Sequence, residues 1–513
     1  MDMIRYDIGL VYRSNHNYGA NLTHYALANY LLKQNNSILL IDMPSGLALS
    51  LPLDRDDPFE LFGCNPYIFI NSLEDIDQHN LGEKAIYVWR AKHIWELDKA
   101  NELCQMFLVG SDQLWRSYFL VGSGHYSLLG WVAEGKYRAS YSTSFGTDSF
   151  EGDDIEIRTV GNLLGEFNRI SIREKSGVQI VNNLSGVKAK WVVDPVFLLG
   201  EEDYSKLIIN DNNEYNIGFY ILDFTDSKIC FLERQIEIYN YSCDGYTDAM
   251  VQKTMDDKLA KYLLISKTVE SWITMIKKSK FVITDSFHGM CFAIIFHKPF
   301  VVIADENIQR GFTRIQELLN RLGLENHIVS NEELNNVCLE DYEDINYKVI
   351  DRILNNCINE SKMWLNETVS EGLATECNSI RCNDCWNKFS ESKYLEHMRK
   401  RNSISNIISD RFSCCEKYVI WGTGNIFSEY SSAVIEETSP IYVVDNNKDK
   451  WGKIYCNYLE CKSPECLYTE DVVVIILVES EYVSNSIINQ LKKYNIGKYI
   501  TYQELAKKDE TTM

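Results

Sequence analysis

Short apolar runs, each followed by a stretch with helical spacing, repeat along the amino-terminal part of the chain. Leu22–Leu32 has the spacing of an amphipathic helix. The runs that predict buried strands are Ile8–Val11, Ile38–Asp42, Met106–Val109, Ala139–Thr143, Arg169–Ile172 and Lys190–Val193. Alternation of strands and helices is typical of a parallel sheet covered by helices. We therefore expect a first α/β domain over residues 1–200.

A second block with the same organisation follows the hydrophilic stretch Gly200–Asn216. Its predicted helix is Met290–Phe296, and its predicted strands are Ile217–Leu222, Phe281–Thr284 and Phe300–Ile303. Residues 332–370 have an acidic, helical pattern that could cross back over the first block. This pattern indicates a second α/β domain over residues 201–370.

A third, smaller block follows a polar, cysteine-containing stretch at 371–415, which we interpret as a linker with a short helix. In the block itself, a turn at Gly422–Gly424 stands between a strand and a helix at Ile426–Ile435. The predicted strands are Tyr418–Trp421, Ile441–Asp445 and Val472–Leu477. Residues 416–513 are therefore expected to form a Rossmann-like domain.

The charge balance restricts the partners. Lys and Arg total 51 against 73 Asp and Glu, which gives a formal net charge of −22. A field of that sign repels nucleic acid, so we expect no nucleic-acid partner. An anionic substrate would need a local group of cations or helix N-termini.

The cysteines and the apolar runs bear on the compartment. The 15 cysteines form no repeating framework, and no basic stretch followed by an apolar run opens the chain. The longest aliphatic run, Val472–Val478, is far shorter than the roughly 20 residues of a membrane span. We expect a cytoplasmic protein with free thiols and no transmembrane segment. Peripheral attachment at the inner face of the membrane and a homo-oligomer both remain open.

The segment Phe281–Ala293 has the strongest functional pattern. An apolar strand ends at Asp285 and Ser286, and a helix containing His288 begins at once. Ligands of open α/β sheets bind at the carboxyl ends of strands, and a helix start suits a phosphate or carboxylate. His288 could donate a proton there or bind an anion. Alternatively, Asp285 and Ser286 only cap the helix and His288 is an interior residue.

Other strand ends carry further candidates. The turn after the first strand contains Asn17, Gly19 and Asn21. Another turn, after Val109, contains Gly110, Ser111, Asp112 and Gln113, whose polar side chains could bind sugar hydroxyls. Single candidates elsewhere are Arg173, Asp194 and Arg314. Taken one at a time, each of these is better explained by ordinary turn chemistry or by a surface arginine.

Together, these pieces resemble the polysaccharide pyruvyl transferase family. The resemblance covers roughly residues 6–325, and the matching segments occur in the same order: Asn17–Leu22, Gly110–Gln113, Ser171–Glu174, Val193–Pro195 and Thr284–Gly289. It implies a GT-B-like fold, in which two Rossmann-like domains face each other. It also implies a transferase that moves a pyruvyl group from phosphoenolpyruvate, its donor substrate, to a sugar of a surface polysaccharide or a lipid-linked precursor. No metal or other cofactor is expected.

The resemblance also suggests roles for residues. His288 would be the general acid or phosphate partner, Arg173 and Arg314 would hold the two anionic groups, and Asp112 or Asp285 would take the hydroxyl proton or orient the acceptor. Many relatives have an arginine immediately before the histidine, where this chain has Phe287. Arg173, Arg314 and the helix N-terminus would then have to supply the missing positive charge.

Two features lie outside this resemblance. Gly422 and Gly424, with Asp445 about 20 residues further on, have the spacing of a nucleotide-binding turn. The third glycine of that motif is replaced by Phe427, so a non-catalytic role is favoured. Cys377, Cys382 and Cys385 have C-x4-C-x2-C spacing without a diagnostic fourth ligand, which favours free thiols over a zinc or iron–sulfur site.

Two other functions remain open from the sequence. One is a GT-B-type glycosyltransferase that uses a nucleotide-sugar, and the other is a non-catalytic partner in glycan assembly. Binding of phosphoenolpyruvate against nucleotide-sugars would separate the first from a pyruvyl transferase.

Overall fold

A computed structural model describes most of the chain. The described residues are 6–12, 17–42, 67–70, 86–91, 93–117, 120, 125–210, 213–240, 242–247, 262–264, 268–304, 311–376, 384–412, 416–456 and 459–511. Their contacts divide into two compact units. The first contains Met1–Asp42, Pro58–Trp89 and Lys99–Arg381, and the second contains Met43–Asp57, Arg90–Asp98 and Cys382–Met513.

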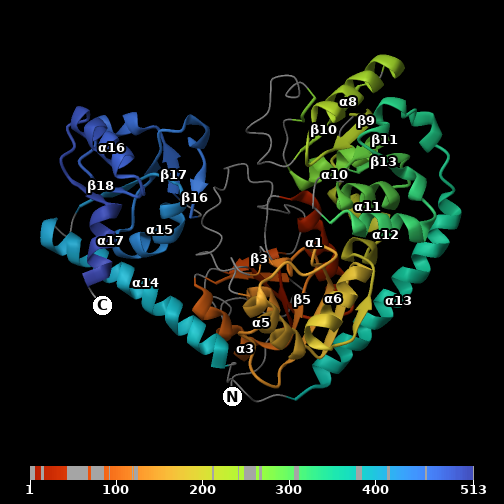
Figure 1. The fold of residues 1–513 in the computed structure, drawn as a ribbon, viewed down its shortest axis with the longest axis horizontal. Helices are drawn as coiled ribbons and strands as arrows, with labels where there is room; N and C mark the ends of the chain where they lie inside the picture. Colours follow the sequence, from red (N-terminus) through yellow and green to blue (C-terminus); the bar gives the residue numbers. More distant parts are fainter. Residues whose placement is uncertain are drawn as a thin grey trace. The chain divides into compact units, whose positions relative to one another are not determined.

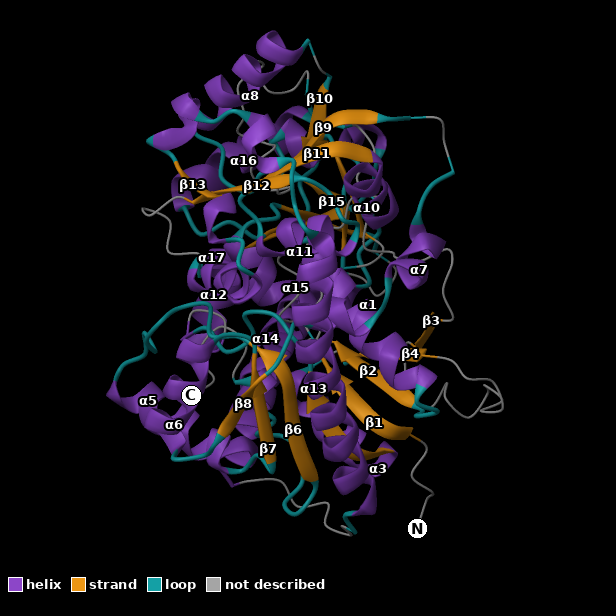
Figure 2. Ribbon diagram, turned by 90° about the vertical axis from the view of Figure 1, so that its right-hand side faces the viewer, coloured by secondary structure: helices purple, strands orange, loops and turns teal. Residues whose placement is uncertain are grey.

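The first sheet of the first unit has eight strands in the order β3-β4-β2-β1-β5-β6-β7-β8. The strands are β1 (Tyr6–Val11), β2 (Ile38–Asp42), β3 (Tyr67–Ile70), β4 (Ile86–Arg90), β5 (Cys104–Val109), β6 (Tyr137–Thr143), β7 (Arg169–Ile172) and β8 (Ala189–Trp191). The pairings from β2 through β8 are parallel, and Figure 2 shows β6, β7 and β8 running side by side. The strand order reverses between β1 and β5.

The second sheet has five strands in the order β10-β9-β11-β12-β13, all paired in parallel. Its strands are β9 (Tyr215–Tyr220), β10 (Cys243–Tyr246), β11 (Ser279–Thr284), β12 (Phe300–Ala304) and β13 (Ile328–Ser330). Here the order reverses between β9 and β11. In open parallel sheets, ligands bind beyond the carboxyl ends of the strands at such a reversal.

Helices connect and cover the two sheets of this unit (Figure 1). They are α1 (Tyr18–Lys33), α3 (Ala100–Leu103), α5 (Asp154–Gly165), α6 (Lys175–Ser185), α7 (Glu201–Tyr204), α8 (Asp226–Tyr239), α10 (Val269–Lys278), α11 (Phe287–Ile295), α12 (Thr313–Leu322) and α13 (Tyr347–Ala374). As predicted, α13 returns from the second sheet to the first. The Tyr137 hydroxyl donates to Glu371 at 2.8 Å, and the Val193 amide donates to Ser361 at 3.1 Å.

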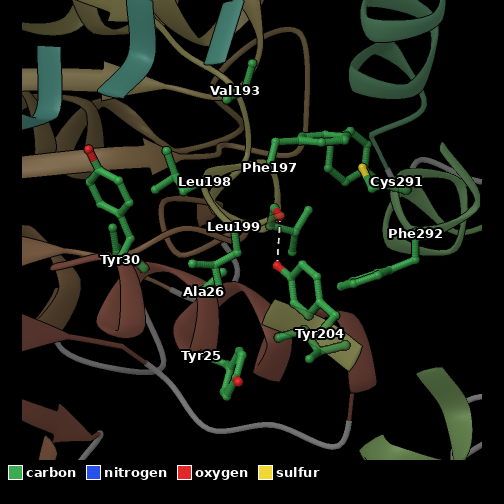
Figure 3. Close-up of a cluster of buried hydrophobic side chains, with 14 of the residues drawn as sticks. Tyr25, Ala26, Tyr30, Val193, Phe197, Leu198, Leu199, Tyr204, Cys291 and Phe292 are labelled. Carbon is green, nitrogen blue, oxygen red and sulfur yellow. Dashed lines mark hydrogen bonds between the residues drawn. The ribbon is translucent and has the colours of Figure 1, made fainter. Parts of the chain in front are cut away.

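One apolar core joins the helices of both sheets. It includes residues of α1, of the 3-10 helix η4 (Pro195–Leu198), of α10 and of α11. Tyr18 of α1 stacks on Trp272 of α10 with 5.9 Å between ring centroids. Figure 3 shows Tyr25 and Ala26 of α1 near Tyr204, whose hydroxyl donates to the Val196 carbonyl at 2.7 Å, and Phe292 beside that ring. This shared core holds α1 against α10 and α11.

The second unit contains a smaller six-stranded sheet in the order β16-β17-β15-β14-β18-β19. Its strands are β14 (Tyr418–Trp421), β15 (Val443–Val444), β16 (Ile454–Tyr455), β17 (Leu459–Lys462), β18 (Val473–Ile476) and β19 (Tyr499–Thr501), and its helices are α14 (Asp384–Arg411), α15 (Asn425–Thr438), α16 (Glu481–Lys493) and α17 (Tyr502–Thr511). Apart from the antiparallel β16–β17 pair, its strands are parallel.

The α/β fold class predicted from the sequence is therefore confirmed, and the described part of the chain contains three mainly parallel sheets. The expectation of only a short helix within 371–415 is wrong, because α14 has 28 residues. Most of α14 is polar, and buried apolar residues such as Ile404 and Ile407 fasten it to the small sheet. The boundaries predicted at 200, 370 and 415 stay predictions.

Candidate functional site

Two strand-end regions of the first unit meet at one place. From the first sheet come Asp112 after β5, Arg173 after β7 and Asp194 after β8. From the second sheet come His288, in the first turn of α11 after β11, and Arg314 in the first turn of α12. The loops after β5 and β11 each follow a strand at which the strand order reverses. This is the location at which open α/β sheets bind ligands.

Arg173 is the centre of the cluster. Its Nε lies 2.9 Å from Asp194 Oδ2, and its Nη2 donates to Ser111 Oγ at 2.6 Å. Its Nη1 lies 3.8 Å from Asp112 Oδ1 and has no hydrogen-bond acceptor among the described residues. Burial by itself would raise the pKa of Asp194, but the Arg173 guanidinium and His288 hold it at about 2. Asp194 is therefore ionised, and one edge of Arg173 remains directed toward Asp112.

His288 is buried beside this pair, with 4% of the residue exposed. Its Nε2 lies 3.8 Å from Asp194 Oδ2, which is too far for a good hydrogen bond. Burial lowers the pKa of His288 below its usual value, while the nearby Asp194 carboxylate acts in the opposite direction. The imidazole is therefore neutral near pH 7 in this state, and it must gain a proton before it can act as an acid.

Phe287 lies between two cations. The guanidinium carbons of Arg173 and Arg314 are 5.1 and 5.3 Å from the centre of its ring. Cations at such distances are attracted to the negative face of an aromatic ring. Burial lowers the pKa of Arg314 to about 10, and the charge of Arg173 adds to this shift. Arg314 therefore remains charged at neutral pH, and Phe287 packs against both guanidinium groups.

Asp112 has an unusual backbone conformation. Its φ of 106° lies in a region that L-residues rarely adopt. Its carbonyl accepts from the Ser144 and Leu114 amides at 2.9 and 2.7 Å, which holds the turn in place. Burial opposes ionisation, but the charges of Arg173, His288 and Arg314 together outweigh it, and the pKa of Asp112 is lowered. Residues in strained backbone conformations cluster at functional sites, so this geometry supports a site role for the Asp112 carboxylate.

The other predicted residues fall into two groups. Ser111 belongs to the cluster, and its hydroxyl donates to the Ser142 carbonyl at 2.7 Å. Asn17 and Ser286 cap α1 and α11, accepting from the Ala20 and Gly289 amides. Asn21 is buried within α1, while Gly110 and Gln113 flank the Ser111–Asp112 turn.

Asp285 is directed away from the cluster. Its carboxylate accepts from the Leu222 and Asp223 amides at 2.7 and 3.1 Å, and from Lys228 Nζ at 2.9 Å. The two amide bonds tie the turn after β11 to the turn after β9, and the bond from Lys228 ties it to α8. The geometry favours a structural role for Asp285, which leaves Asp112 as the better placed of the two predicted acids.

Gly19 permits the contact between the two helix starts. A Cβ atom at this position would lie 2.2 Å from His288 Cβ. We predict that Gly19→Ala displaces α11 or the imidazole, lowering the melting temperature and reducing turnover together. Gly165→Ala is the matched control, since a Cβ there meets nothing within 4 Å. Equal melting temperatures and turnover in wild type and Gly19→Ala would contradict the close approach.

Three residues that were not among the predicted site residues also shape the cluster. Glu174 accepts from the Phe145 amide at 2.9 Å, and burial raises its pKa. Gly311 has a φ of 74°. A Cβ atom on it would lie 2.5 Å from the carbonyl oxygen of Gly146, which is in a loop of the first sheet. Phe287 was noted in the sequence only as the residue that stands where the resemblance leads us to expect an arginine. The signals in the sequence were the resemblance and the adjacency of Glu174 to Arg173 and of Phe287 to His288.

In the predicted nucleotide-binding turn of the second unit, the Asp445 carboxylate already has hydrogen-bond partners within that unit. Asp445 Oδ2 accepts from the Thr423 amide and hydroxyl at 3.1 and 2.8 Å and from Lys450 Nζ at 2.9 Å. Gly422 adopts a φ of 99°, as a tight turn requires, and Gly424 precedes α15. An Asp445 carboxylate held in this way supports the structural interpretation over a ribose contact. Cys377 and Cys382 lie outside the described residues, as does the side chain of Cys385.

The first unit is therefore a two-sheet α/β protein with a polar cluster at its strand ends. The family model for polysaccharide pyruvyl transferases matches residues 17–307, which is more than half of the 513 residues. The chain belongs to the polysaccharide pyruvyl transferase family, and it is a transferase. The matched segment contains Asp112, Arg173, Asp194 and His288, whereas Arg314 lies just beyond it.

Comparisons with individual proteins add little to this. No curated protein matches the chain. Among solved structures, the chain is similar to UDP-N-acetylglucosamine 2-epimerase from Rickettsia bellii, with 9% identity and a TM-score of 0.45 over 72% of this chain and 97% of the epimerase. It is also similar to Glycyrrhiza uralensis UGT73P12, with 10% identity and a TM-score of 0.42 over 76% and 100% of the two chains. Likeness at this level bears on neither substrate nor mechanism.

Within the described part of the chain, none of the helices combines the length and the apolar character needed to cross a membrane.

Proposed function

We propose that this transferase moves the pyruvyl group of phosphoenolpyruvate onto hydroxyl groups of a surface polysaccharide or its lipid-linked precursor. The observation that carries the proposal is the convergence of Arg173, Asp194 and Asp112 from one sheet with His288 and Arg314 from the other. A donor with a carboxylate and a phosphate needs two fixed cations and a proton source, and this cluster contains both.

The chemistry assigns a task to each group. A sugar hydroxyl adds to C2 of phosphoenolpyruvate while C3 gains a proton, so the new carbon–oxygen bond forms as the double bond is lost. The bond from C2 to the phosphate oxygen then breaks, and a second hydroxyl closes the ketal as its proton leaves. Inorganic phosphate is released. The step therefore requires an acid near C3, a base near the hydroxyl and cations that stabilise the anionic groups.

His288 is the acid in this scheme. Burial keeps the free imidazole neutral, but a bound phosphate dianion would favour the imidazolium and raise the pKa of His288. His288 would therefore become protonated, and able to act as an acid, only when the donor is bound. Asp112, held ionised beside Arg173, orients the acceptor hydroxyl and takes its proton.

The arginines hold the donor. Arg173 Nη1 and the guanidinium of Arg314, both within reach of the Phe287 ring, would form charge-assisted bonds to the carboxylate and the phosphate. The charge of Arg173 is already balanced by Asp194 at 2.9 Å. The second cation, Arg314, is therefore essential to net anion binding. Since Arg173, Asp194 and His288 are all buried, the strand-end loops must separate for the donor to enter.

Calorimetry tests the donor. The wild-type protein should bind phosphoenolpyruvate and should bind UDP-sugars far more weakly. Arg314→Gln should weaken phosphoenolpyruvate binding by about tenfold or more, since a charge-assisted bond contributes about 1.5–3 kcal/mol. Arg321→Gln is the matched control on the same helix. The Arg321 guanidinium packs over the Trp191 ring instead, with 3.9 Å between its carbon and the ring centre. Preference for a UDP-sugar would overturn the proposal in favour of a glycosyltransferase.

A further inference from the structure

The second unit contains a cluster of possible metal ligands that pyruvyl transfer does not use. It consists of His93, His397 and Glu436, whose ligand atoms all lie within 4.8 Å of one another. His93 Nε2 is 2.7 Å from Glu436 Oε1, and His397 Nε2 is 3.0 Å from Glu436 Oε2. The three residues come from separate segments: His93 precedes the 3-10 helix η2 (Ile94–Lys99), His397 is on α14 and Glu436 is on α15.

The two imidazoles are held with their Nε2 atoms directed at the same carboxylate. Trp95 stacks on the His93 ring with 4.2 Å between centroids and an interplanar angle of 9°, and it lies 5.2 Å from the His397 ring. The side chains of His93 and His397 are 13% and 11% exposed. The ring orientations are therefore fixed by packing, which lowers the cost of assembling a metal site.

The charge around the cluster also suits a divalent cation. Arg401 Nη1 lies 3.0 Å from Glu436 Oε2, while Arg401 Nε pairs with Glu437 at 2.7 Å. Two carboxylates and one guanidinium leave one net negative charge beside the two imidazoles. Arg401 can hold Oε2 while Oε1 is left to a metal, as outer partners commonly do for ligating carboxylates.

We propose that His93, His397 and Glu436 form a binding site for a divalent transition metal of the zinc type. Two imidazole nitrogens and one carboxylate oxygen form a set that suits Zn²⁺, Co²⁺ or Ni²⁺ and disfavours Ca²⁺ and Mg²⁺, with a fourth position left to water. The bound ion fastens the segment that begins at His93 to α14 and α15. His93 and Glu436 are 343 residues apart in the sequence, so such a link joins two parts of the second unit that come before and after Lys99–Arg381 of the first unit.

Cobalt spectroscopy on the full-length protein tests the site, because it separates nitrogen and oxygen ligands from the thiolates of the chain's cysteines. After removal of metals with a chelator, Co²⁺ should bind at one ion per chain with visible d–d bands and no thiolate charge-transfer band. His397→Gln and Glu436→Gln should each weaken binding by at least about tenfold, because losing a ligand costs no less than losing one of its outer partners. His297→Gln is the matched control, since His297 pairs with Asp351 in the other unit.

Thermal unfolding gives the second readout. Zn²⁺ should raise the unfolding temperature of the wild type and of His297→Gln, but not that of the two ligand variants, since only a folded site gains from binding. Unfolding temperatures measured in the presence of chelator show whether each variant folds. One ligand variant that folds is enough for the test. No Co²⁺ binding by the wild type, unchanged affinity in a folded ligand variant or a thiolate band alone would overturn the proposal.

Discussion

Replacing His288 with asparagine should abolish pyruvyl transfer and leave the protein folded. The imidazole lies at the meeting point of the two strand-end regions, 3.8 Å from Asp194. In the proposed mechanism it supplies the proton to C3, and removing a positioned acid typically costs about 10²–10⁴-fold in rate. Asparagine retains a polar group beside Gly19 without adding volume. Phosphate release from phosphoenolpyruvate, measured in the presence of an acceptor glycan, gives the rate.

The pH dependence should separate an acid from a merely structural histidine. Burial lowers the pKa of His288 below 6.5 in the free protein, and only the protonated form can act. We therefore expect kcat/KM for phosphoenolpyruvate to fall as the pH rises through a value below 6.5, and kcat to fall at a higher pH because the bound donor raises the pKa. His288→Asn should lose this dependence together with the rate.

A second buried histidine provides the control. His327 is 4% exposed, and its Nδ1 lies 2.9 Å from the Phe300 carbonyl oxygen, away from the cluster. His327→Asn should lower stability but retain the pH profile of the wild type. Near-normal turnover by His288→Asn would show that another group protonates the donor.

Arg173→Met should have the largest combined effect on stability and activity. The substitution leaves the Asp194 carboxylate buried without its main cation, and breaking a buried pair in this way costs about 3–5 kcal/mol. It also removes the guanidinium edge that faces Asp112 and the Phe287 ring. Chemical denaturation should show the loss of stability, and turnover should fall below detection.

The double variant Arg173→Met with Asp194→Asn distinguishes the two losses. Removing the unpaired charge should restore part of the stability, while transfer stays absent because the donor has lost one cation. Recovery of transfer along with stability would mean that Arg173 acts only by holding the fold.

Acid unfolding gives a further readout of the same pair. The pKa of Asp194 is lowered from 3.8 to about 2 in the folded protein, so its ion pair stabilises the fold fully above pH 3.8. That contribution is lost as the pH falls through about 2. The Arg173→Met variant should lack this particular acid transition.

The sequence contained most of what locates the candidate site. Ligand-binding loops of parallel sheets lie at strand ends, and the apolar runs before Asp112, Arg173 and His288 correspond to β5, β7 and β11. The return of a helix from the second sheet to the first also followed from an acidic, helical pattern. What the runs could not show is which strand ends meet, because that depends on strand order and on the packing of α1 against α11.

Other features escaped sequence patterns for physical reasons. The strand β10 has the sequence Cys243–Tyr246, in which a polar Asp and a Gly interrupt any apolar run. The strand β13 has three residues, too short for a periodicity to be seen. His93, His397 and Glu436 are so far apart in the chain that only the folded second unit brings them together.

A crystal structure of the protein with phosphoenolpyruvate tests the central claim most directly. The account predicts donor density between Arg173 and Arg314, with the C3 carbon within reach of His288 and Asp112 beside the position of the attacking hydroxyl. A competing position exists at the amino ends of β11 and β12, where Lys277, Lys278, Lys280 and Lys298 line a pocket of about 550 Å³. Donor density there, with an unchanged Arg173–His288 cluster, would contradict the account.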